Sequence, residues 1–152
     1  MKENKEKSNM NNKEENIFQS LIRGETAAVE TYNQLLEKIE STAEKTKVRA
    51  IRDDHQTALS QLKTYTEFKD GDVPEGSGYW GTFAAGFVGS AKAFGETATV
   101  KALKMGEEHG VELYKNALDS DSVSSEAKDY ILKQHLPKME LHINTLNAVI
   151  KH

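Results

Sequence analysis

The sequence predicts an all-α four-helix bundle, and three observations support this fold class. Long runs rich in Ala, Glu, Lys and Leu, interrupted by only two prolines, favour helix over strand. Apolar residues recur at helical spacing in four separate segments. Two of these segments carry the same short motif, which indicates two related helical hairpins. The length of 152 residues fits a single domain.

Composition narrows the classes of function. Hydrophobic residues make up 37% and charged residues 29% of the chain, as in soluble proteins. A formal net charge of -4 provides no basic field for nucleic acid. The absence of cysteine excludes disulfides, thiolate metal sites and cysteine nucleophiles. We therefore expect a bacterial, cytoplasmic protein that binds no nucleic acid.

The N-terminal segment differs in composition from the rest. Residues 1–15 are charged and almost without apolar side chains, so we predict a disordered tail there. No apolar stretch follows the early lysines, which argues against a secretory signal. The bundle itself is predicted over residues 16–152.

Periodicity places the first two helices over about 13–40 and 42–69. Both begin near a polar residue followed three positions later by glutamate, the spacing of a capping box. The predicted capping pairs are Asn12 with Glu15 and Ser41 with Glu44. A Gly- and Pro-containing stretch, residues 70–76, ends the second helix.

A long connection follows, and residues 78–95 carry no charge until Lys92. Its large side chains, Trp80, Phe83 and Phe87, fall at helical spacing. The segment is shorter than the ~20 residues that a membrane span requires. We expect a short crossover helix that packs on the bundle, or else a contact surface in a homo-oligomer.

The last two helices are predicted over about 97–118 and 125–151. Ser124 is in position to cap the fourth helix. Pro137 lacks an N–H group, so it should kink this helix.

The repeated motif lies in residues 24–32 and 106–114, which share Gly, Glu, Val, Glu and Tyr at one constant offset. At about 100° per residue, Glu25 and Tyr32 fall on the same apolar face of the first helix. Glu107 and Tyr114 repeat this arrangement on the third helix. Each copy therefore places one glutamate and one tyrosine toward the core.

The second and fourth helices each place a histidine, His55 and His142, within their apolar faces. A carboxylate in a hydrophobic core is costly unless it is paired, hydrogen-bonded or bound to metal. Glutamates and imidazoles that converge between four helices suit Fe, Mn or Zn. The candidate ligands of a divalent metal are Glu25, His55, Glu107 and His142, with the hydroxyls of Tyr32 and Tyr114 around them.

The segment Gly106-Glu107…Tyr114-Lys-Asn-Ala-Leu118, preceded by the aromatic connection, resembles the ferritin-like superfamily. In particular, it looks like a bacterial four-helix family of unknown function that is related to rubrerythrins. The resemblance covers residue 17 to the C-terminus. It implies a ferritin-like bundle of two duplicated hairpins joined by a long crossover, with a role linked to metal handling or stress.

The sequence departs from the di-iron members of that superfamily, which carry Glu-x-x-His on the second and fourth helices. Both histidines are kept, but Arg52 and Met139 stand where the glutamates would be. The loss of both carboxylates argues against a full di-iron centre. Arg52 is expected instead to pair with a core glutamate, Glu25 or Glu107.

Two interpretations of the polar core follow. In one, it binds a metal ion; in the other, a metal-free Glu–Arg–His–Tyr network fixes the helix register of a non-enzymatic scaffold or oligomerising module. The sequence assigns neither a reaction nor a substrate. We expect the remaining histidines, His109, His135 and His152, to face solvent, although His135 lies one heptad before His142 on nearly the same face.

Overall fold

A computed structural model describes residues 10–78 and 95–150, and all regular structure within them is helical. The prediction of an all-α chain with four helices is therefore confirmed. The predicted tail lies largely, and the crossover with Trp80, Phe83 and Phe87 entirely, outside the described residues, as does His152. The elements are α2 (Asn12–Leu35), the 3-10 turn η1 (Leu36–Lys38), α3 (Thr42–Phe68), α5 (Glu96–Asp119), α6 (Ser125–Tyr130), the π-helical turn η2 (Ile131–His135) and α7 (Leu136–Ile150).

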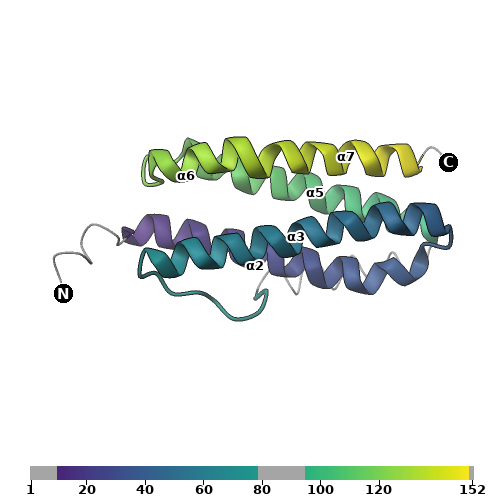
Figure 1. The fold of residues 1–152 in the computed structure, drawn as a ribbon, viewed down its shortest axis with the longest axis horizontal. Helices are drawn as coiled ribbons and strands as arrows, with labels where there is room; N and C mark the ends of the chain where they lie inside the picture. The colour runs from purple at the N-terminus through teal and green to yellow at the C-terminus, as the bar shows by residue number, and fades with distance from the viewer. Residues whose placement is uncertain (1–9, 79–94, 151–152) are drawn as a thin grey trace.

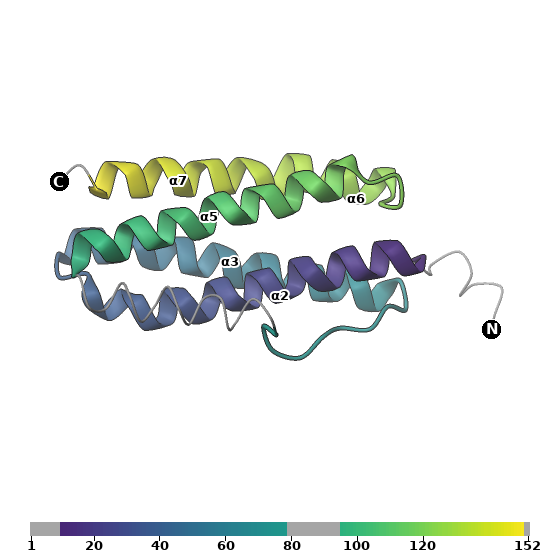
Figure 2. The ribbon, with the colours of Figure 1, turned by 180° about the vertical axis from the view of Figure 1, so that it is seen from behind.

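The helices form two antiparallel pairs that lie against each other. α2 packs mainly on α3, and α5 packs mainly on α7 (Figure 1). α3 and α5 both run opposite to α2, while α7 runs parallel to α2 (Figures 1 and 2). The end of α3 and the start of α5 therefore lie at opposite ends of the bundle. None of the helices in the described parts is long and apolar enough to cross a membrane.

Side-chain caps fix the starts of three helical segments. The side chain of Asn11 accepts the N–H of Glu14 at 2.8 Å. Ser41 accepts the N–H of Glu44 at 3.3 Å, and Ser124 accepts the N–H of Ala127 at 3.1 Å. A cap of this kind typically contributes about 1 kcal/mol. The predicted caps at Ser41 and Ser124 are confirmed.

The first cap is one residue earlier than predicted, since it is Asn11 rather than Asn12. A tertiary contact explains this register. The carboxylate of Glu14 is buried and accepts the N–H of Ser124 at 2.9 Å, which ties the start of α2 to the start of α6. Glu15, the predicted capping partner, instead accepts the N–H of Asp72 at 2.7 Å.

The fourth helical segment changes its winding just before Pro137. In η2 the N–H of Leu136 bonds to the carbonyl of Ile131, five residues back. The predicted disturbance by proline therefore takes the form of a π-helical turn, whose wider winding relieves the crowding that the pyrrolidine ring causes. His135 is the last residue of this turn.

Two hydrophobic clusters fill the two ends of the bundle. The first includes Leu35, Ile39, Val48, Ile51, Val100 and Leu146, and the second includes Phe18, Leu21, Ile22, Leu62, Ala117 and Ile131. Burying each such leucine, isoleucine or phenylalanine contributes about 1.5–3 kcal/mol. A layer of buried polar side chains lies between the two clusters at mid-length. Within the described residues, it is the only layer to which all four long helical segments contribute buried ionisable groups.

Candidate functional site

The glutamates and tyrosines of the repeated motif bind each other across the bundle. The hydroxyl of Tyr32 on α2 donates to Glu107 Oε2 on α5 at 2.5 Å. The hydroxyl of Tyr114 on α5 donates to Glu25 Oε2 on α2 at 2.5 Å. All four side chains are buried. This reciprocal pattern is what two copies related by an approximate two-fold axis produce, and it links the two hairpins.

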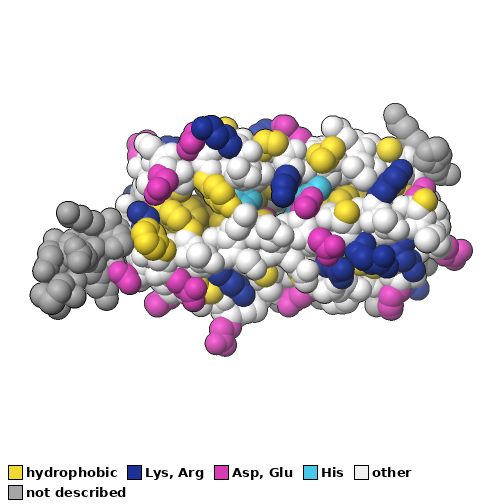
Figure 3. All heavy atoms as spheres, in the orientation of Figure 1, with side chains coloured by type: hydrophobic (Ala, Val, Ile, Leu, Met, Phe, Trp, Pro, Cys, Tyr) yellow, Lys and Arg dark blue, Asp and Glu magenta, His cyan; other side chains and the backbone are white. Residues whose placement is uncertain are grey.

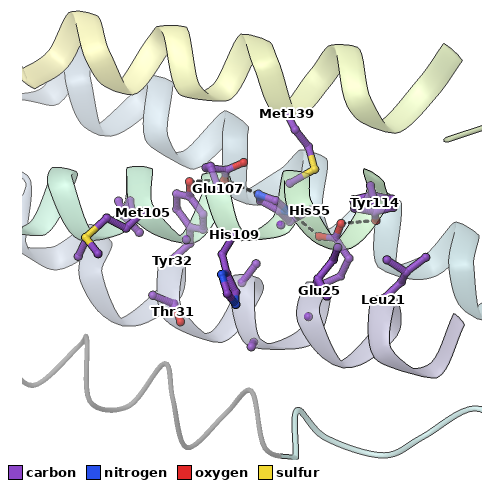
Figure 4. A pocket seen from close by; sticks show the side chains of 18 residues that line it. Leu21, Glu25, Thr31, Tyr32, His55, Met105, Glu107, His109, Tyr114 and Met139 are labelled. Atoms are coloured by element: carbon purple, nitrogen blue, oxygen red, sulfur yellow. Dashed lines mark hydrogen bonds and ion pairs between the residues drawn. The ribbon is translucent and has the colours of Figure 1, made fainter. Parts of the chain in front are cut away.

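His55 joins the two glutamates (Figure 4). Its Nδ1 lies 2.5 Å from Glu25 Oε1 and its Nε2 lies 2.5 Å from Glu107 Oε2. With both glutamates ionised, both bonds are made at once only when the ring is doubly protonated. His55 is then an imidazolium held between two buried carboxylates.

His142 extends the network toward the surface. Its Nδ1 lies 3.1 Å from Glu107 Oε1, and its Nε2 lies 2.9 Å from Asp54 Oδ2. Asp54 is on α3 and its side chain is 36% exposed. Histidine atoms are visible between charged side chains on the face that α3 and α7 form (Figure 3). Sequence reasoning missed Asp54, because its position beside His55 gives no sign that it reaches a histidine on another helix.

Burial and charge act in opposite directions on the ionisable groups. Burial alone would lower the pKa of His55, but the attraction of Glu107 and Glu25 outweighs it and raises the pKa well above 6.5. Burial alone would raise the pKa of Glu107, but His55 and a hydrogen bond from His142 lower it from 4.5 to about 2. Burial and then Glu107 raise the pKa of Tyr32 well above 10, so this hydroxyl remains a donor.

Arg52 does not join the network, contrary to the expected pairing with Glu25 or Glu107. Its guanidinium bonds Asp53 at 2.9 Å and Asn33 at 2.7 Å, both at the surface. His55 makes the contacts expected of Arg52, because imidazole is short enough to fit between two carboxylates. Met139, the second departure, is buried among apolar side chains.

His135 is buried rather than solvent-facing. Its ring stacks on Tyr114 with centroids 4.9 Å apart and meets the edge of Tyr130 at 5.0 Å. Its Nε2 has no hydrogen-bond partner among the described residues. Burial lowers its pKa below 6.5, so the ring is neutral at pH 7. Its position one heptad before His142, on nearly the same helical face, agrees with this burial.

We expect His135→Phe to leave the protein as stable as the wild type at pH 7 or more stable. An unpartnered buried polar atom costs about 1–3 kcal/mol, and phenylalanine keeps the ring contacts without that atom. Because the pKa of His135 is lowered on folding, the unfolded wild type takes up the proton first below pH 6.5. The advantage of the variant should therefore grow from pH 6.5 toward pH 5, as measured by thermal melts.

His109→Phe on the exposed side of α5 is the matched control, and its effect should not change in this way with pH. A loss of more than about 1 kcal/mol for His135→Phe at both pH values would show that the imidazole makes a contact the ring stacking does not explain.

A cavity of about 180 Å³ adjoins the network between α2 and α5. The inner side of the cavity is formed by Glu25, His55 and Glu107, and we call these three ionisable residues its floor. Tyr32 lies toward one end of the cavity and Tyr114 toward the other (Figure 4).

The fold and the site define a helical-bundle protein with a buried Glu–His–Tyr network at mid-length. The chain belongs to the family described as a domain of unknown function, DUF2383, which matches residues 7–120. The matched part contains Glu25, His55 and Glu107 and ends before His142. Comparison with curated proteins and with solved structures finds no match.

Proposed function

We propose that the protein binds one divalent metal ion in the bundle core, through His55, Glu107 and His142. The observation that carries this proposal is the arrangement around the two histidines. Each ring directs one nitrogen to Glu107 and the other to a second carboxylate, Glu25 or Asp54. Metal-binding histidines in proteins are oriented by such a carboxylate on the far nitrogen.

The spacing of the three side chains supports the proposal. One ligand atom from each lies within 4.8 Å of the others, and all three residues are buried. Two nitrogens bound to one tetrahedral zinc ion at about 2.1 Å lie about 3.4 Å apart, so the side chains must shift by about 1 Å to close on an ion. Two imidazoles and one carboxylate suit zinc, manganese or iron.

Glu25 takes a different role in this proposal from the one first expected. It lies on the nitrogen of His55 that faces away from Glu107, so it supports a ligand rather than serving as one. Metal binding requires His55 to lose the proton on Nε2, and affinity should therefore rise with pH. With three protein ligands, the bound ion would supply a Lewis-acidic centre with open positions.

We extend the proposal to the fold family. The antiparallel order of the helices, with one long return between α3 and α5, supports a ferritin-like bundle of two duplicated hairpins. The chemistry of a single ion with open positions suits metal handling or defence against oxidants, in a cytoplasmic protein.

A metal-free structural network is the second candidate, and one observation favours it. Every ionisable group of the layer already has a partner, from Tyr114 through Glu25, His55 and Glu107 to His142. Such a network can fix the register of four helices without a ligand. The two candidates differ in what added metal does to the stability.

Metal titration of chelator-treated protein tests the proposal. We expect Zn²⁺ or Mn²⁺ to bind at one ion per chain and to raise the melting temperature. At a hundredfold excess over Kd the stabilisation is about 2.7 kcal/mol, which corresponds to roughly 5–11 °C for a domain of this size. His142→Gln should abolish the shift, whereas His109→Gln, the same substitution outside the cluster, should retain it.

Fe²⁺ added anaerobically extends the comparison to a redox-active ion. The absence of any shift with all three ions at saturating concentration would leave the structural network as the function of these residues.

A further inference from the structure

The cavity beside the floor has walls built from the two copies of the repeated motif. α2 and α5 contribute nearly all of its lining, and His55 and Met139 reach it from the other two helices. Its volume of about 180 Å³ exceeds the roughly 150 Å³ of an engineered apolar cavity that binds benzene. A ring of six or seven non-hydrogen atoms therefore fits.

Small residues at the centre of each wall create this space. At about 100° per residue, Ala28 lies in the middle of the α2 arc that lines the cavity, and Gly106 lies in the middle of the α5 arc. Among residues 10–78 and 95–150, a Cβ atom added at Gly106 would meet nothing within 4 Å. Ala28 and Gly106 do not bring the backbones of α2 and α5 into close contact, because the space beside them remains as a cavity.

The charges at the cavity disfavour an ionic ligand. Its buried charged lining groups are Glu25, His55 and Glu107, and each of them is already paired with another. His109 also lines the cavity, from the exposed side of α5. No lysine, arginine or aspartate lines the cavity within the described residues. An ion that entered would lose its water without gaining a free counter-charge, which is costly.

The floor nevertheless retains capacity for one more hydrogen bond. A carboxylate offers about four acceptor positions, and two of those on Glu25 are occupied by the hydrogen bonds with His55 and Tyr114. An uncharged molecule with one hydroxyl can therefore place its apolar part against the walls and donate to the floor. Apolar walls with a few convergent polar groups are typical of small-molecule sites.

We propose that this cavity binds a small uncharged organic molecule of about phenol size, with an apolar body against Ala28 and Gly106 and a hydroxyl directed at the carboxylates of the floor. The inference rests on the site proposed above, to which it adds an organic ligand. It does not require the ion, because the paired floor is in place without one.

Titration of the full-length protein with phenol, followed by amide NMR, tests this inference. Shifts that saturate and cluster on α2 and α5 are expected. Benzoate and benzylammonium, which have the same ring and carry opposite charges, should bind at least tenfold more weakly than phenol. Benzene, which lacks the hydroxyl, should bind several-fold more weakly.

Two variants fill the cavity from opposite walls, Gly106→Leu on α5 and Ala28→Leu on α2. Each should weaken phenol binding at least tenfold. Ala50→Leu adds the same side chain on the exposed face of α3 and should leave the affinity unchanged. Two filling variants are used so that loss of folding in one, detected by circular dichroism, still leaves the other to decide.

The titrations are run once with chelator and once with saturating Zn²⁺. Phenol binding that survives in both filling variants, or charged analogues that bind as tightly as phenol, would overturn the inference. Failure of Zn²⁺ to bind would overturn the metal proposal alone, because phenol binding is read separately in the chelated protein.

Discussion

Glu107→Ala should lower the free energy of unfolding by about 3–5 kcal/mol when metal is chelated. Glu107 is 2% exposed and accepts hydrogen bonds from Tyr32, His55 and His142. Its removal leaves a buried imidazolium facing one carboxylate instead of two, and it leaves the tyrosine hydroxyl without its acceptor. Breaking a buried ion pair by removing one partner costs about this much.

The measurement is urea unfolding, supported by a fall in melting temperature of roughly 6–20 °C. Glu112→Ala is the matched control, because Glu112 lies on the same helix with its side chain exposed, and its effect should be within about 0.5 kcal/mol. If Glu107→Ala were as mild as Glu112→Ala, the network would contribute no net stability and its retention would have to be explained by a ligand.

His55→Ala should be similarly destabilising at pH 6.5, and its cost should shrink on acidification. Without the imidazolium, Glu25 and Glu107 face each other as buried carboxylates, so the pKa of the pair rises in the folded state. A group whose pKa is raised on folding takes up its proton in the native state first, and stability then increases as pH falls. Unfolding free energies of wild type and variant at pH 6.5, 5.5 and 4.5 measure the change.

In the wild type, His55 and Glu107 lose their stabilising contributions at different pH values. His55 stabilises fully below its unfolded pKa of 6.5, and this contribution is lost as pH rises toward its raised folded value. Glu107 stabilises fully above its unfolded pKa of 4.5, and this contribution is lost as pH falls toward about 2. Neither group changes the wild-type stability between pH 6.5 and 4.5. A smaller difference in unfolding free energy between wild type and His55→Ala within this window therefore reports protonation of the carboxylate pair that has lost its histidine.

His135 titrates in both proteins and cancels from the difference. His109→Ala, on the exposed side of α5, should follow the wild-type profile in parallel. A difference between wild type and His55→Ala that stays constant or widens from pH 6.5 to 4.5 would contradict the ion-pair description of this layer.

Local rules account for the parts of the fold that the sequence predicts well. Ser41 and Ser124 cap helices because the capping group and the backbone that it serves are three residues apart. The burial of Glu25, His55, Glu107 and His142 follows from helical periodicity, which depends only on neighbours along the chain. The repeated motif also identifies the first and third helices as equivalent.

Long-range contacts account for the parts that sequence reasoning did not reach. The first cap moved to Asn11 because Glu14 binds Ser124 of a distant turn. Arg52 turned outward because His55 already occupies the space between the carboxylates. His135 turned inward, where its ring stacks on Tyr114 of α5, as its position one heptad before His142 allows.

The sequence by itself determined that four helices each direct one ionisable side chain into the core, because periodicity assigns a side chain to a face. The tertiary structure decided how these side chains pair, because pairing depends on distances between helices that no local pattern encodes. It placed His55 between Glu25 and Glu107 and brought Asp54 to His142. Of the four candidate ligands, three converge as a group that could hold a metal ion, and the carboxylates of Glu25 and Asp54 lie beside the two histidines.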